Sequence, residues 1–121
     1  MVTDMTSRLR EPSYFILAAL QDEPLHGYAI ITHADELSDG RVKLATGTLY
    51  AALDRLTGEG LIEAVREEIV NGRARRYYAL TPPGHAALKA EAAALTQAAR
   101  VVTDRAARQS TVSHRPQAGL A

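Results

Sequence analysis

The stretch of sequence that decides the fold is residues 61–80, LIEAVREEIVNGRARRYYAL. Residues 61–67 are rich in strand-forming side chains, and Asn71 followed by Gly72 is a strong short-range signal for a hairpin turn. Residues 75–80 are expected to return as the second strand. Three arginines stand beside the turn, at positions 73, 75 and 76. The stretch therefore predicts a β-hairpin with a basic tip.

Two helices are expected before this hairpin. Pro12 can open the first, because the first turn of a helix does not need the N–H that proline lacks. Residues 14–20 are apolar nearly all round, which is typical of a helix at the centre of a small core, and the acidic turn at residues 21–24 ends it. The second helix is expected from about residue 25 or 26 to residue 37, with its apolar side chains on one face.

A third helix is expected to begin at Thr46, whose side-chain oxygen can act as an N-cap. Leucines at positions 49, 53 and 56 form its buried seam, and Gly58 and Gly60 end it. Residues 41–44 alternate charged and apolar side chains and are expected to form a short strand. Helix, helix, short strand, helix and hairpin is the order of a winged helix-turn-helix. We assign this mostly α (α+β) fold to residues 10–80.

A long alanine-rich helix is expected over residues 81–108. Its apolar side chains recur with spacings of 4, 3, 4, 3 and 4, which makes a heptad seam. Such a helix can pack on its own domain or on a second copy, and we expect it to form a homodimer, with help from the first helix because alanine buries little surface. The expected interface residues are Leu88, Ala92, Leu95, Ala99, Val102 and Ala106. Residues 109–121 show no periodicity and are expected to be a disordered tail.

The composition limits the class of protein. A chain of 121 residues forms one domain, or a small domain with an appendage, and leaves little room for a deep active site. It has no Cys, which excludes disulfides, thiolate metal sites and cysteine nucleophiles. Residues 1–10 do not resemble a secretory signal, and no apolar run approaches the roughly 20 residues of a membrane-spanning helix. We therefore expect a soluble intracellular protein without a membrane partner.

The charges are balanced in number but unevenly placed. The chain has 14 Lys and Arg against 14 Asp and Glu. Residues 21–40 hold five acids and no Lys or Arg, whereas residues 41–80 hold seven bases and five acids. A local basic patch can bind phosphate whatever the total charge, so the zero net charge does not exclude a nucleic-acid partner.

Three strings of the sequence lie in order between about residues 9 and 90. They are LHGYAI at residues 25–30, GTLY at residues 47–50 with the leucines and Gly60 that follow, and RRYYALT at residues 75–81 with Gly84. Together these strings resemble the PadR family of phenolic-acid-decarboxylase-repressor-like regulators. The single long C-terminal helix resembles that of the short subgroup of the family.

The resemblance implies a bacterial transcriptional regulator, usually a repressor, that binds an inverted-repeat operator as a homodimer. It also implies a cytoplasmic location, on the nucleoid when the protein is bound to DNA. Some members of the family bind flat aromatic ligands at the dimer interface with tryptophans. This chain has no Trp, so that mode of binding is not carried over. A small-molecule effector is a possible partner, but no residue of the sequence identifies its binding site.

The residues expected to contact double-stranded DNA lie on the third helix, just before it, and on the hairpin. A recognition helix meets base edges and phosphates through its N-terminal residues, and arginines beside a turn suit the phosphate backbone or the minor groove. Since side chains alternate along a strand, Arg73 and Arg75 are expected to share a face that Arg76 does not. The full set is Lys43, Thr46, Thr48, Tyr50, Ala51, Arg55, Asn71, Arg73, Arg75 and Arg76.

Plainer roles are open for several of these residues. Thr46 can serve as an N-cap alone, and Tyr50 can pack into the domain. Arg55 can pair with Glu59 one turn further along the helix. Exposed arginines are also common on hairpin edges without any ligand.

No combination of residues indicates catalysis, a cofactor or a metal site. The chain lacks a Ser/His/Asp set, a glycine-rich phosphate loop and a suitably spaced pair of carboxylates, so we expect no enzyme. His26 and His33 lie two helical turns apart without a third ligand, so one is expected to be a cap and the other a surface residue. Tyr77 and Tyr78 are expected to be one exposed and one core ring.

These observations favour a dimeric, sequence-specific DNA-binding regulator that acts as a repressor. Its third helix would lie in the major groove and its hairpin along the flanking backbone. The alternative is a winged helix that serves as a protein-interaction or ligand-sensing module without specific DNA binding.

Overall fold

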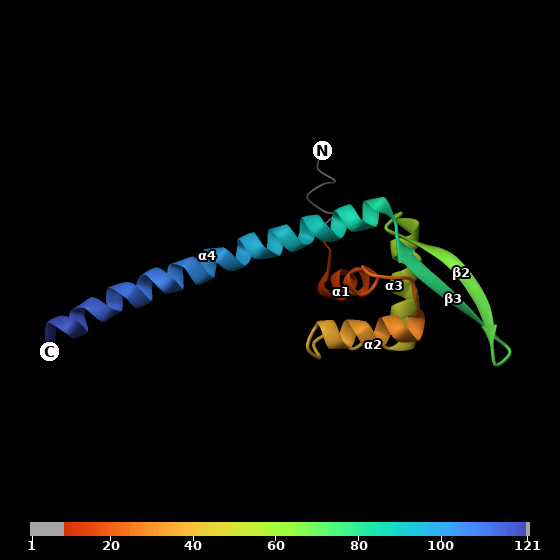
Figure 1. The fold of residues 1–121 in the computed structure, drawn as a ribbon, viewed down its shortest axis with the longest axis horizontal. Helices are drawn as coiled ribbons and strands as arrows, with labels where there is room; N and C mark the ends of the chain where they lie inside the picture. The colour runs from red at the N-terminus through yellow and green to blue at the C-terminus, as the bar shows by residue number, and fades with distance from the viewer. Residues whose placement is uncertain (1–8, 121) are drawn as a thin grey trace. The chain divides into compact units, whose positions relative to one another are not determined.

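The computed structural model describes residues 9–120, and the side chains of residues 9–109. Three helices, a hairpin and a last helix follow one another in the predicted order (Figure 1). The elements are α1 (Glu11–Ala19), β1 (Leu25–His26), α2 (Gly27–Leu37), α3 (Thr46–Gly58), β2 (Ile62–Val70), β3 (Arg73–Leu80) and α4 (Pro82–Leu120). The chain divides into two compact units, one ending at Glu91 and one beginning at Ala92. The winged-helix fold is confirmed for the first unit.

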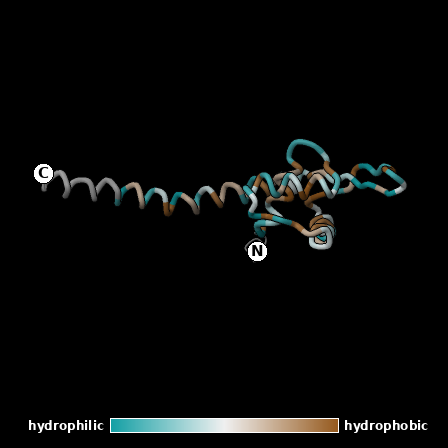
Figure 2. Tube along the Cα trace, turned by 90° about the horizontal axis from the view of Figure 1, so that it is seen from below, coloured by the Kyte–Doolittle hydropathy of each residue, from teal (hydrophilic) through white to brown (hydrophobic). Residues whose placement is uncertain are grey.

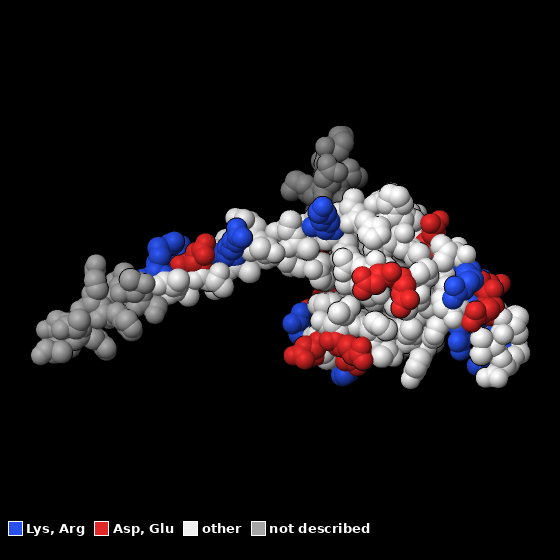
Figure 3. Space-filling model, viewed as in Figure 1, with Lys and Arg blue, Asp and Glu red and all other residues white. Residues whose placement is uncertain are grey.

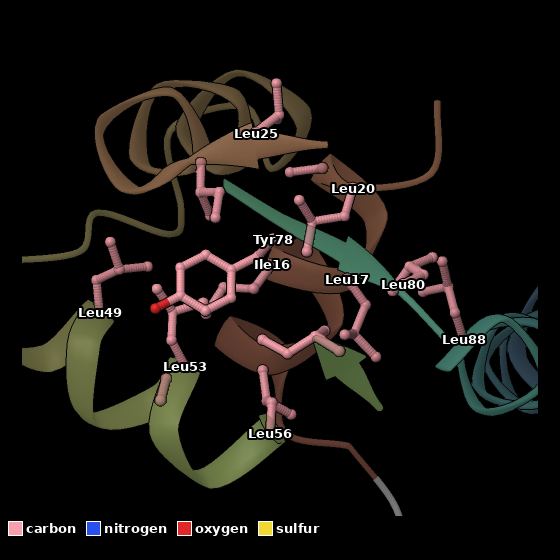
Figure 4. Close-up of a cluster of buried hydrophobic side chains, with 14 residues drawn as sticks. Ile16, Leu17, Leu20, Leu25, Leu49, Leu53, Leu56, Tyr78, Leu80 and Leu88 are labelled. Carbon is pink, nitrogen blue, oxygen red and sulfur yellow. The ribbon is translucent and has the colours of Figure 1, made fainter. Parts of the chain in front are cut away.

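The core of the first unit is built around α1. Ile16 and Leu17 of this helix are fully buried, because α1 is apolar nearly all round and has neighbours on most sides. Leucines of α3, Tyr78 and Leu80 of β3, and Leu88 of α4 close around them (Figure 4). Each fully buried Leu or Ile stabilises the fold by roughly 1.5–3 kcal/mol relative to an exposed one. Tyr78 is the expected core ring of the two adjacent tyrosines, but Tyr77 is half-buried and not the exposed ring that was expected beside it.

The sheet has three antiparallel strands in the order β1, β3, β2. Its third strand is not where the sequence placed it. Residues 41–44 form no strand, because the Val42 N–H donates to the hydroxyl of buried Ser38 at 2.8 Å and needs no strand partner. The third strand is instead Leu25–His26, which pairs with Tyr77 and Tyr78 immediately before α2 begins.

The hairpin of β2 and β3 has the predicted two-residue turn. Asn71 and Gly72 have φ angles of 52° and 77°, the left-handed values that a type I′ turn requires at both central positions. The hairpin projects to one side of the helices (Figure 1). A bulge interrupts β2, since Ala64 pairs with Tyr78 but Arg66, two residues later, pairs with Tyr77. The bulge shifts every pair between it and the turn by one residue.

One helix start uses a different cap from the predicted one, and another uses the predicted cap. The N-cap of α3 is Ala45, without a side-chain hydrogen bond, and Thr46 is the first helical residue. Thr46 therefore does not cap the helix. At α2, the predicted cap is confirmed, because the Ala29 N–H donates to Nδ1 of His26 at 3.5 Å.

The last helix begins at a close contact with the strand region. The Thr81 hydroxyl accepts from the Gly84 N–H at 3.0 Å and donates to the Gly60 carbonyl oxygen at 2.6 Å. Gly84 is buried, and a Cβ there would lie 1.9 Å from the Leu61 carbonyl oxygen. The residue must therefore be glycine for α4 to start at this place.

The backbone of α4 continues to Leu120, beyond the expected end near residue 108. No Gly or Pro stands between Gly84 and Pro116, so the sequence has no helix-ending residue where the end was expected. Hydrophilic and hydrophobic residues alternate along the described part of the helix (Figure 2). Among the described residues, no helix combines the length and the apolar character needed to cross a membrane.

Replacement of Gly84 by alanine should destabilise the first unit by about 1–3 kcal/mol, because the added Cβ meets backbone rather than a flexible side chain. The matched control is Gly58→Ala, since a Cβ at Gly58 meets nothing within 4 Å. Urea unfolding should give a lower midpoint for Gly84→Ala and an unchanged or slightly higher one for Gly58→Ala. Equal midpoints would contradict the close contact.

The stability should also depend on the protonation of His26. Burial, and then the positive charge of Arg75, lower the pKa of His26 below 6.5, although Glu68 opposes the shift. Since the folded chain binds this proton less readily than the unfolded chain, the free energy of unfolding should fall as the pH drops through about 6.5.

The variant that tests this is His26→Asn, which keeps a cap acceptor but does not titrate. Urea unfolding at about pH 7.5 and 5.5 should show a smaller loss of stability on acidification for this variant than for the wild type. An equal loss in both proteins would assign the pH dependence to other groups.

Candidate nucleic-acid interface

A cleft of about 560 Å³ lies between the start of α2, Tyr50 of α3 and the tip of the hairpin. This volume is within the range of roughly 300–1,000 Å³ that ligand sites occupy. Three elements distant in sequence thus meet at one place. The cleft is lined by His26, Gly27, Tyr28, Tyr50, Val70, Asn71, Arg73, Ala74, Arg75 and Arg76.

The charge of this lining is positive only. Its arginines are Arg73, Arg75 and Arg76, and no Asp or Glu lines the cleft. Lys and Arg side chains stand close to Asp and Glu side chains at the hairpin end of the molecule (Figure 3). The acids of the hairpin, which include Glu67 and Glu68, lie outside the lining, so the charge of the lining favours an anion.

The three arginines differ in their surroundings. The Arg76 guanidinium lies 3.6 Å from the Glu67 carboxylate, and a hydrogen bond with Tyr78, followed by the charge of Glu67, raises its pKa. Arg73 and Arg75 form no ion pair with any of the described side chains, and Arg73 is exposed whereas Arg75 is half-buried. The two arginines expected to share a strand face are therefore the ones free to meet a ligand.

A cluster on the outer face of the sheet supports the base of the hairpin. The Arg66 guanidinium lies 3.9 Å from the centre of the Tyr77 ring, and the Tyr77 hydroxyl donates to Glu68 at 3.0 Å. The His26 ring meets the edge of Tyr77 at 5.4 Å. Glu68 pairs with Arg75 across the strands. Arg66 is thus held against the Tyr77 ring, and the cluster stabilises β3, the strand that carries Arg75.

The N-terminal half of α3 exposes the residues that the sequence assigned to DNA. Thr46, Thr48 and Ala51 are exposed, and Tyr50 is 46% exposed at the cleft. Since no side chain caps α3, its first N–H groups are open to an anion. This part of α3 and the cleft are the two surfaces suited to a phosphate backbone.

Two predicted cations are engaged elsewhere. Arg55 donates to the hydroxyl of Ser13 on α1 at 2.7 Å, so its partner is neither Glu59 nor the cleft. Lys43 lies 3.2 Å from the Asp35 carboxylate, although the Lys43 side chain is largely exposed. Neither residue lines the cleft.

Tyr28 was not among the predicted contacts of this surface, and His26 was expected only as a cap or a surface residue. Tyr28 is 75% exposed and lines the cleft. A signal for it was present, because Tyr28 lies two positions before buried Ile30 and therefore on the opposite face of α2. His33, by contrast, is exposed and bonded to the Ala29 carbonyl oxygen at 3.0 Å, as expected for a surface residue.

The predicted dimer seam is exposed except at its start. Leu88 is 5% exposed and packs in the core of the first unit, so it is not available as a seam residue. The heptad pattern could not separate it from the others, since core and seam positions share the same spacing. Leu95 and Val102 are 43% and 67% exposed, and Ala99 and Ala106 are also exposed.

The described residues contain no group of three or more His, Cys, Asp or Glu side chains that could hold a metal ion. Around the cleft and at the start of α3, the exposed polar groups include those of arginine, hydroxyl and amide side chains.

Comparison with known proteins places this chain in a family. Residues 16–90 match the profile of the transcriptional regulator PadR-like family. The transcriptional regulator Rv3488 of Mycobacterium tuberculosis is 42% identical over 87 residues, which cover 72% of this chain and 78% of that protein.

Solved structures agree with this assignment. A PadR family transcription regulator from hypervirulent Clostridium difficile R20291 has a TM-score of 0.65 and 25% identity, over 78% of this chain and 97% of that one. Bacillus subtilis PadR, solved in complex with operator DNA, has a TM-score of 0.59 and 30% identity, over 66% of this chain and 46% of that one. The chain belongs to the PadR-like family of transcriptional regulators, and not to a family of enzymes.

Proposed function

We propose that this regulator binds an inverted-repeat operator in duplex DNA as a homodimer and represses transcription from it. The observation that carries the proposal is the cleft, whose only charged side chains are arginines and which joins the helix-turn-helix to the hairpin. The related PadR of Bacillus subtilis was solved with operator DNA, which supports the same partner here. The proposed place of action is the bacterial nucleoid.

In this proposal α3 is the recognition helix. Its N-terminal N–H groups and the hydroxyls of Thr46 and Thr48 bind phosphates at the edge of the major groove, and Ala51 faces the bases. Arg73 and Arg75, with the Asn71 amide, bind the backbone beside it. Arg55 supports α3 through Ser13 and is not a direct contact in this arrangement.

The homodimer is proposed to form through α4. Leu95 and Val102 are large apolar side chains that lie exposed seven residues apart, and a second copy of the same helix would cover them. Two copies would place two recognition helices on one duplex with two-fold symmetry. An effector that changed the spacing of those helices would release the DNA.

The first test is selection of bound sequences from a randomised duplex pool at about physiological salt. We expect an inverted repeat whose half-sites lie about one helical turn apart, because the two α3 helices of a dimer meet successive major grooves. Recovery of no sequence above background by a preparation that is dimeric would contradict specific operator binding and favour an interaction module.

The contribution of the hairpin is tested by the double variant Arg73→Ala/Arg75→Ala. If each subunit neutralises about four phosphates, the wild-type dimer should show a log–log salt slope near −7, and the variant a slope near −3.6. Fluorescence anisotropy with a labelled duplex between about 50 and 200 mM salt measures both slopes. Lys89→Ala is the control, because it removes an exposed cation of α4 that does not line the cleft. A slope unchanged in the double variant would remove the hairpin from the interface.

The dimer is tested by Val102→Asp. A buried carboxylate in the seam should convert the dimer to monomers and reduce operator affinity by more than tenfold, since unpaired charges are costly to bury. Val101→Asp is the matched control, because Val101 is 65% exposed but lies one position off the seam. Sedimentation equilibrium should find monomers only for Val102→Asp. Dimers of both variants would place the interface elsewhere.

A further inference from the structure

Tyr28 has an exposure that packing does not explain. It is 75% exposed, more than any other large apolar or aromatic side chain of the described residues. Among those residues, its hydroxyl has no hydrogen-bond partner, whereas the Tyr77 hydroxyl is bonded to Glu68. Its backbone is firmly part of α2, and its carbonyl oxygen accepts from the Thr32 hydroxyl at 3.2 Å. A fixed backbone therefore presents a free phenol to the cleft.

Tyr50, the second tyrosine of the cleft, lies beside Tyr28 because Gly27 has no side chain. A Cβ on Gly27 would lie 2.6 Å from the Tyr50 hydroxyl oxygen and 3.1 Å from the ring carbon that carries it. The Tyr50 ring thus lies directly on the backbone at the start of α2, beside Tyr28. Two tyrosines from two helices line one side of the cleft, and Arg73 and Arg75 belong to the hairpin on its other side.

We infer that Tyr28 is a further DNA-contacting residue, whose hydroxyl and that of Tyr50 bind a backbone phosphate of a DNA strand that runs through the cleft. The inference rests on the proposed function and extends it to α2. Phosphate oxygens accept hydrogen bonds from neutral hydroxyls as well as from arginines, and such contacts position the duplex without reading its sequence. The lining offers both kinds of donor and no acid that would repel the phosphate.

The contact has a signature that separates it from an arginine contact. A neutral hydroxyl displaces no counterion when it binds phosphate, so its loss lowers affinity without changing the salt slope. The Tyr28→Phe variant removes only the oxygen and keeps the ring. Binding of a labelled duplex of unrelated sequence should weaken by about 2- to 10-fold for each subunit bound, with the wild-type slope.

The experiment measures anisotropy over a range of salt concentrations for the wild type, Tyr28→Phe and the control Tyr14→Phe, which removes the same atom from a tyrosine of α1 outside the cleft. Loss of affinity in Tyr28→Phe alone, with an unchanged slope, supports the contact. Equal affinity of Tyr28→Phe and the wild type overturns the inference and leaves the proposed function in place. A shallower slope in Tyr28→Phe also overturns it, because Tyr28 would then act by placing an arginine. No binding by the wild type overturns both proposals.

A second measurement tests the wall that Tyr28 and Tyr50 share. Gly27→Ala should weaken DNA binding, because the new Cβ displaces the end of the Tyr50 side chain. In a Tyr50→Phe background, the same replacement should have a smaller effect, since the atom it strikes is already absent. Urea unfolding checks that each variant is folded. Equal effects in the two backgrounds would show that the Tyr50 hydroxyl does not bind at this wall.

Discussion

The pairing of Leu25 and His26 with Tyr77 and Tyr78 is the constraint on which the rest of the functional surface depends. The strand is only two residues long, yet each of its residues has a structural role besides the pairing. Leu25 packs in the core, while His26 caps α2 and meets the ring of Tyr77. Because β3 also carries the arginines of the hairpin, this pairing sets the distance between the start of α2 and those arginines. Beyond the two paired residues, the start of α2 and the tip of the hairpin line the cleft.

The bulge in β2 arranges the charges around that junction. In an uninterrupted register, Arg66 would stand opposite Arg76, and like charges directly across two strands repel. The shift instead puts Glu67 opposite Arg76 and Glu68 opposite Arg75, and leaves Arg66 to stack on Tyr77. The extra residue therefore removes the repulsive pairing and adds one oppositely charged pair, since Glu67 would stand opposite Arg75 in the uninterrupted register. The shifted register also leaves the exposed Arg73 beside the turn of the hairpin.

The sequence predicted those features that depend on local patterns. Helical spacing located α1, α2 and α3, and Asn71 with Gly72 located the turn. It missed the features that depend on contacts between distant residues. The two-residue strand β1 is too short to show a pattern, and the partner of Arg55 is Ser13, 42 positions away. The arginine tip of the site was therefore predictable. Helical spacing could also put Tyr28 on the exposed face of α2, but its place in the cleft depends on where α2, α3 and the hairpin lie in the fold.

The uneven placement of charge has a consequence for the way the protein approaches DNA. Acids dominate residues 21–40, whereas the Asp-, Glu-, Lys- or Arg-type charges of the cleft lining are those of arginines alone, so a chain of zero net charge still has a local positive surface. In the field of a duplex, such a molecule experiences a torque that turns its cleft toward the phosphates and little net pull at long range. Charge therefore acts on the orientation of the protein in each encounter more than on the number of encounters.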